Sequence, residues 1–190
     1  MKYVKILGLA AIAAMAMMAF AGSASASTLK VGGVTQNNAV KIEASLTSGT
    51  SATLKTTSGS FQDTCTTSEV VGTTNVFHPP SGPISKLTFG NCTHTTHVVT
   101  NGSLSVERIG STENGTVSSS GAEVEVESTT FGVTLVCKTN NTDVGTLTGT
   151  TSGHAVMDIN GVVNCGFFVP SAKWEGSYTV TSPTGLSVGA

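Results

Sequence analysis

The sequence is poor in charged and in aromatic side chains. Charged residues make up 11% of the 190 residues, aromatic residues make up 5%, and there is a single tryptophan. The formal net charge is −2, and no stretch of the chain is rich in lysine or arginine. Such a surface lacks the basic patch that binds nucleic acid or anionic lipid, so we expect neither as a partner.

Familiar catalytic and metal-binding motifs are scarce as well. The chain has no H-E-x-x-H zinc motif and no calcium loop of alternating aspartates. Ser152 and His154 lie two residues apart, but no third group is at hand to orient the histidine as a base, so the pair is better interpreted as a turn. We therefore expect a protein that is not an enzyme, with no cofactor, no metal and no catalytic residue.

The one long hydrophobic run lies at the N-terminus. A short basic start leads into an apolar stretch at residues 6–20, and small residues follow up to Ala24-Ser25-Ala26. This pattern predicts a secretory signal peptide, residues 1–26, which is cleaved after Ala26. The run is shorter than the roughly 20 apolar residues of a membrane span, so we expect no span after cleavage. The mature chain, residues 27–190, has the size of a single domain and is predicted to be secreted, either free or held at the cell wall.

All four cysteines lie in this mature part. Exported proteins meet an oxidising environment, so disulfide bonds are expected. Four cysteines allow three connectivities. We favour the sequential one, Cys65 with Cys92 and Cys137 with Cys165, because it closes two loops of nearly equal length. Each bond would stabilise the fold by about 3 to 4 kcal/mol in the loop-entropy description.

Short alternating segments separated by turns fill the mature chain. In AVKIEASL, for example, Val40, Ile42 and Ala44 fall on one side of an extended strand. Pairs such as Asn101-Gly102 and Asn114-Gly115 are typical of turns. Threonine, which is abundant, suits the solvated face of a sheet. The pattern predicts an all-β protein, a disulfide-stapled antiparallel β-sandwich of immunoglobulin-like or jelly-roll-like outline with about nine to eleven strands.

The stretch NCTHTTHVV, residues 91–99, raises the question of a metal site. Ligands must converge on one point, whereas His94 and His97 would point to opposite faces of a strand. Cys92 is expected to be oxidised, which removes the thiolate. A site here would need His78 or a carboxylate brought in by the fold, so we interpret the stretch as a loop or strand end.

Three glutamates form the first candidate for a ligand surface. Glu123, Glu125 and Glu127 alternate with valines, so they share one strand face at a spacing of about 7 Å. A pair of such carboxylates could hydrolyse a glycoside. A solvated face that protects an edge strand from pairing is the better interpretation.

Trp174 is the second candidate. An exposed tryptophan could stack on a sugar, as in a carbohydrate-binding module. Trp174 shares a predicted strand face with Tyr178 and Val180, however, which is typical of a core tryptophan.

The C-terminal part of the chain, residues 145–188, has a recognisable pattern that consists of Leu147 to Gly149, Asp158 to Asn160, Cys165, Trp174, Tyr178 and Thr181 to Pro183. This pattern resembles the ending of a family of small exported proteins encoded in actinobacteria. The resemblance implies a secreted bacterial β-protein and transfers no catalytic residue.

These observations together favour a secreted or envelope-associated binding or structural protein that acts through a β-sandwich surface. Its partner would be a cell-wall or extracellular polysaccharide, a protein, or a second copy of the chain. One alternative is a fibre subunit, because STLKVGG and TGLSVGA at the two ends are predicted strands that could pair with a neighbour. A carbohydrate-binding module and a secreted glycan-active enzyme are the others.

Overall fold

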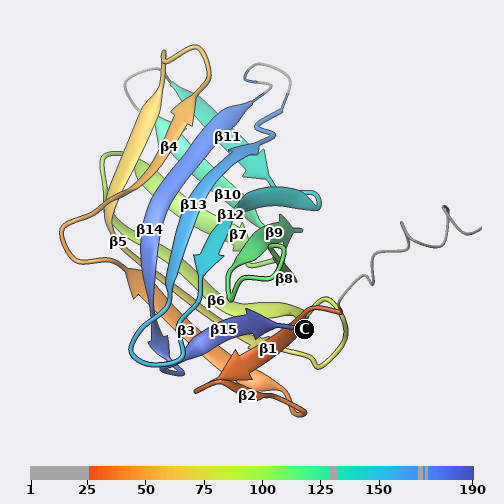
Figure 1. Ribbon diagram of the computed structural model, residues 1–190. Helices are drawn as coiled ribbons and strands as arrows, with labels where there is room; N and C mark the ends of the chain where they lie inside the picture. The colour runs from red at the N-terminus through yellow and green to blue at the C-terminus, as the bar shows by residue number, and fades with distance from the viewer. Residues whose placement is uncertain (1–25, 129–131, 167–168, 170) are drawn as a thin grey trace, which may run out of the picture.

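The computed structural model describes residues 26–128, 132–166, 169 and 171–190 (Figure 1). The described chain consists of β-strands joined by turns, with no helix. Consequently no described segment is a helix long and apolar enough to cross a membrane. The predicted signal peptide lies outside the described residues except for Ala26.

The main sheet has the strand order β13-β12-β9-β8-β6-β5-β3-β14-β4, and β13 also pairs with β14. Its strands are β3 (Val40–Leu46), β4 (Ala52–Thr56), β5 (Gln62–Thr74), β6 (Ser81–Cys92), β8 (Ser103–Arg108), β9 (Gly115–Ser120), β12 (Thr142–Thr148), β13 (Val156–Val163) and β14 (Ala172–Ser182). The β13–β14 pairing closes eight of these strands into a barrel. The predicted antiparallel all-β class is therefore confirmed, but the main sheet is a closed barrel and not clearly a sandwich.

β3 and β4 pair with successive stretches of the same two neighbouring strands. Both strands pair with β5 and with β14, and residues 47–51 form a loop between them. β5 and β14 are long enough, at 13 and 11 residues, to pair with two short strands each. Splitting of this kind raises the number of strands to fifteen, above the predicted nine to eleven.

Two three-stranded sheets complete the fold. One has the order β15-β1-β2, formed by β1 (Thr28–Val31), β2 (Val34–Thr35) and β15 (Leu186–Gly189). The other has the order β11-β10-β7, formed by β7 (Thr95–Thr100), β10 (Glu123–Ser128) and β11 (Val133–Lys138). We call the second one the cap sheet, because its inner face packs across one end of the barrel.

The first and last strands close the other end of the barrel (Figure 1). β1 and β15 pair with each other, and Leu29, Leu186 and Val188 enter the main hydrophobic core. The outer edge of β15 is also bonded, since the Val188 N–H donates to the Glu113 carbonyl at 2.9 Å. The two terminal segments are strands, as predicted, but their backbone groups pair with each other within a single chain.

The disulfide bonds join Cys65 to Cys92 and Cys137 to Cys165, in the sequential pairing predicted from loop length. Cys92 ends β6 just before β7, and Cys137 lies in β11. The second bond tethers β11, an edge strand of the cap sheet, to the segment after β13, whereas the first links the neighbouring barrel strands β5 and β6.

Candidate functional site

The cap sheet packs on the barrel through apolar side chains. Val126 and Leu135 on its inner face form a buried cluster with Phe61, which precedes β5, and Leu54 of β4 packs against this cluster. Alternation along β10 explains the arrangement, because every second residue of the strand faces inward. The glutamates between the valines consequently face away from the barrel.

An apolar cavity of about 50 Å³, the upper cavity, lies between the cap sheet and the barrel. Its walls include Val124 and Val126 from the cap sheet and Leu87, Phe89 and Trp174 from the barrel. Cys65 and Cys137, one cysteine from each disulfide, also line it. The Cys137–Cys165 bond, which reaches β11, therefore holds one side of the roof of this cavity in place.

Trp174 is a half-buried residue that packs inward at this site. It packs against the main core and against the Cys137–Cys165 cluster, and its ring meets Phe89 edge-on at 6.0 Å between centroids. The core interpretation of Trp174 is the one that this geometry supports. An exposed platform for stacking a sugar would need the opposite orientation.

The polar end of the upper cavity is Asp63, a carboxylate whose side chain is only 2% exposed. Asp63 Oδ1 accepts hydrogen bonds from Thr93 Oγ1 at 2.8 Å and from the His94 N–H at 2.9 Å, and Oδ2 accepts one from Thr96 Oγ1 at 2.6 Å. Thr93 and His94 form the turn between β6 and β7, and Thr96 lies at the start of β7. Asp63 therefore organises the stretch NCTHTTHVV, a role that the sequence analysis did not assign to it.

His94 and His97 take different positions around this turn. The ring of His94 packs on Phe61 at 4.8 Å between centroids, and its Nδ1 lies 3.5 Å from Asp63 Oδ1. His97 is exposed and sits opposite Glu125 in the cap sheet. The two histidines thus do not meet at one point.

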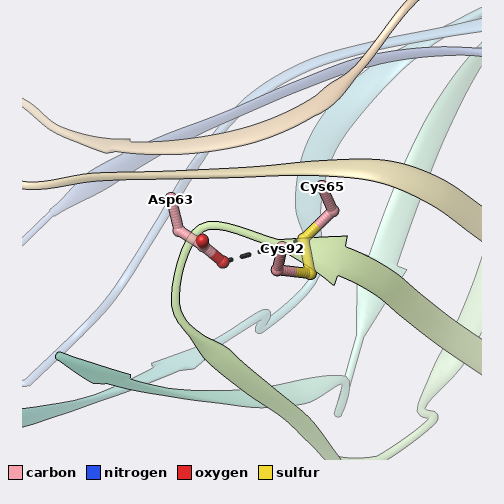
Figure 2. A group of neighbouring side chains, drawn as sticks. All are labelled: Asp63, Cys65 and Cys92. Carbon is pink, nitrogen blue, oxygen red and sulfur yellow. Dashed lines mark hydrogen bonds between the residues drawn. A yellow bond between two sulfur atoms is a disulfide. The ribbon is translucent and has the colours of Figure 1, made fainter. Parts of the chain in front are cut away.

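Asp63 also lies close to both sulfur atoms of a disulfide (Figure 2). The dashed line in Figure 2 joins Asp63 Oδ2 to Cys65 Sγ, 3.7 Å apart. A disulfide sulfur carries no proton to donate, so we interpret this approach as a packing contact. Because Cys65 and Cys92 are bonded to each other, they supply no thiolate for a metal.

The three glutamates lie on the outer face of the cap sheet. β10 is the central strand of that sheet, flanked by β7 and β11, so the prediction that the glutamates protect an edge strand is wrong. Glu123 forms an ion pair of 2.9 Å with Lys138 of β11. Alternation along the strand revealed which side chains share a face, but it could not reveal the neighbours of that strand.

The Ser152–His154 pair has no catalytic geometry. The Nδ1 of His154 donates to the carbonyl of Val180 at 2.8 Å, and the Ser152 N–H donates to Thr150 Oγ1 at 3.2 Å. The pair is part of the loop before β13, as the turn interpretation predicted.

One match to a catalytic-serine motif has to be compared with the structure. Residues 185–189, GLSVG, have the G-x-S-x-G spacing of a nucleophile elbow. Ser187 lies in β15 in register with Lys30, is 0% exposed, and its Oγ has no hydrogen-bond partner among the described residues. A nucleophile needs a neighbouring base and a path for substrate, so this serine is not placed for catalysis.

Comparison with known proteins adds no relative: no protein-family model, no curated protein and no solved structure matches this chain.

Proposed function

We propose that this protein is an exported, non-enzymatic binding protein, and that its ligand is a small apolar molecule held in the upper cavity. The observation that carries the proposal is the upper cavity itself, an apolar space with a buried carboxylate on its wall and a roof that one disulfide, Cys137–Cys165, tethers. An apolar cavity with a few converging polar groups is the usual form of a small-molecule site. Closed eight-stranded barrels can enclose one small ligand.

Export is supported by two independent features. The N-terminal sequence has the form of a signal peptide, and the structure pairs all four cysteines in disulfides. We place the protein outside the cell, either free or at the envelope.

The test is thermal unfolding of the purified protein with and without saturating xenon, an apolar probe small enough for this cavity. A ligand that binds only the folded state raises Tm, and we expect a rise for the natural protein. Ala122→Val narrows the upper cavity and should remove the rise. Ala155→Val is the matched control, because Ala155 is equally buried but belongs to the main core and not to the wall of this cavity. An unchanged Tm in the natural protein, or the same rise in both variants, would contradict the proposal.

A second candidate is binding through the outer face of the cap sheet to a polymer or protein of the cell envelope. Its support is the outward-facing, partly exposed position of this sheet face, with the glutamate row at its centre. Sedimentation with isolated cell walls tests it. Pelleting with the walls that is lost when Glu123, Glu125 and Glu127 are replaced by Gln would favour this face over the cavity.

A further inference from the structure

Three cavities lie in series inside the barrel. The upper cavity shares the wall residues Leu87, Ala122 and Trp174 with a middle cavity of about 10 Å³. The middle cavity in turn shares Val70, Ile84, Leu104 and Met157 with a lower cavity of about 70 Å³. The lower cavity reaches Leu29 and Leu186 of the terminal strands. A line of voids, divided only by side chains, therefore follows the barrel interior from the cap sheet to the opposite end.

The shape of this line of voids limits the width of the ligand that can enter it. The barrel wall is a closed hydrogen-bonded sheet, so its diameter is fixed by strand pairing. The dividing side chains can change rotamer, and the unbranched Met157 adapts most readily. A narrow molecule could displace these partitions, whereas a fused-ring molecule would have to open the sheet. An unbranched alkyl chain fits this requirement.

The head of the ligand is selected by Asp63. Its carboxylate is an acceptor only, and Oδ2 takes a single hydroxyl bond from Thr96, which leaves capacity for one more donor. A ligand that carries its own carboxylate would bring two like charges together in an apolar environment, which is unfavourable. A hydroxyl or an ammonium group would instead donate a hydrogen bond to Asp63.

We propose, on the basis of the function proposed above, that the barrel takes a linear aliphatic alcohol or amine. The head group bonds to Asp63 beneath the cap sheet, and the chain runs from the upper cavity towards the lower one. Fatty acids of the same length bind more weakly, because their carboxylate would lie beside that of Asp63.

The test compares octanol, octylamine and octanoate at neutral pH, with the emission of Trp174 as the readout. Trp174 is the single tryptophan and lines both the upper and the middle cavity. We expect saturable changes with octanol and octylamine and binding at least about tenfold weaker for octanoate, a difference of about 1.4 kcal/mol. Equal binding of all three compounds, or tighter binding of octanoate, overturns the proposal.

Two variants locate the two ends of the ligand. Asp63→Asn removes the charge and should weaken the binding of octylamine and strengthen the binding of octanoate. An unchanged order of affinities would place the head group elsewhere and overturn the assignment. Ala44→Val narrows the lower cavity, where Ala44 is part of the wall. This variant should weaken the binding of dodecylamine and leave that of hexylamine unchanged. Equal effects on both amines would contradict a ligand chain that runs from the upper cavity to the lower one. Because Ala44 lies far from the β6–β7 turn in the chain, this second result does not depend on how well the Asp63 variant folds.

Failure of this inference is distinguishable from failure of the proposed function. A Tm rise with xenon that Ala122→Val abolishes, together with no preference among the octyl compounds, would keep the binding function and reject the linear ligand. Absence of both effects would reject both proposals.

Discussion

The hydroxyl of Tyr178 donates a hydrogen bond of 3.0 Å to Ser68 Oγ in the interior of the barrel. Tyr178 is 0% exposed, and this burial raises its pKa to about 12, although the bond to Ser68 acts in the opposite direction. Ser68 passes the chain of bonds on to the carbonyl of Thr88 at 2.8 Å. β14, β5 and β6 are thus linked by one short polar path inside an otherwise apolar core.

This raised pKa predicts a loss of stability at high pH. The unfolded chain releases the tyrosine proton near pH 10, whereas the folded protein keeps it until about pH 12, so the stabilisation is complete below pH 10 and declines as the pH rises towards 12. The decline amounts to about 3 kcal/mol. Urea unfolding between pH 9 and pH 12 measures it. Tyr178→Phe should remove this part of the pH dependence, and an identical slope in the variant would contradict the assignment.

Asp63→Ala is expected to destabilise the fold by about 3 kcal/mol, because three donors, two in the β6–β7 turn and one at the start of β7, lose a charged acceptor in a buried place. Asp143→Ala is the control, since Asp143 accepts one hydrogen bond, from Ser118, at an exposed position. We expect less than about 1 kcal/mol for the control. Equal losses in urea unfolding would show that Asp63 is not the organiser of the turn.

Replacing both Cys137 and Cys165 by Ser should cost about 3 to 4 kcal/mol and loosen the cap sheet. The bond joins β11 to the segment after β13, and among the described residues an isolated bridge between Lys138 and Asn164 is the one backbone pairing between these two regions. Hydrogen exchange of the β10 and β11 amides is therefore expected to accelerate.

The Cys65–Cys92 bond provides the comparison. These cysteines face each other in the ladder between β5 and β6, which remains paired when the bond is removed. The double Ser variant of this pair should leave exchange in β10 and β11 nearly unchanged. The same acceleration in both variants would contradict the separate role of the second bond.

Glu123→Gln removes the ion pair with Lys138 and should change stability by less than about 0.5 kcal/mol. The reason is solvent screening, since the Lys138 side chain is 60% exposed. Urea unfolding at low and at high salt checks this. A loss of more than 1 kcal/mol, on the order of a buried interaction, would mean that the outer face of the cap sheet is covered in solution.

The sequence predicts the local structure of this protein better than it predicts the closure of the main sheet into a barrel. Alternation at Val40, Ile42 and Ala44 and in the EVEVE segment correctly indicates strands with one buried face, and loop length correctly favours the observed cysteine pairing. Period-two patterns look the same in an open and in a closed sheet. The pairing of β13 with β14, which closes the barrel, therefore leaves no separate mark in the sequence.

The candidate site depended on contacts between distant residues. Asp63 receives its hydrogen bonds from residues about thirty positions away, and the histidines that first drew attention are only neighbours of that carboxylate. One signal was present: aspartate is disfavoured inside strands, so Asp63 in FQDTCTT was a residue in need of a special environment. The orientation of Trp174, in contrast, followed directly from the alternation of its strand.

The pairing of β1 with β15 also sets the order in which the molecule can be completed. Thr28 is in register with Gly189, so the first described strand finds its main partner only when the last one has been made. Contacts between residues so far apart in sequence form slowly. During synthesis this end of the barrel must therefore stay open. If the chain crosses a membrane before it folds, β1 can pair with β15 only after β15 has also reached the far side.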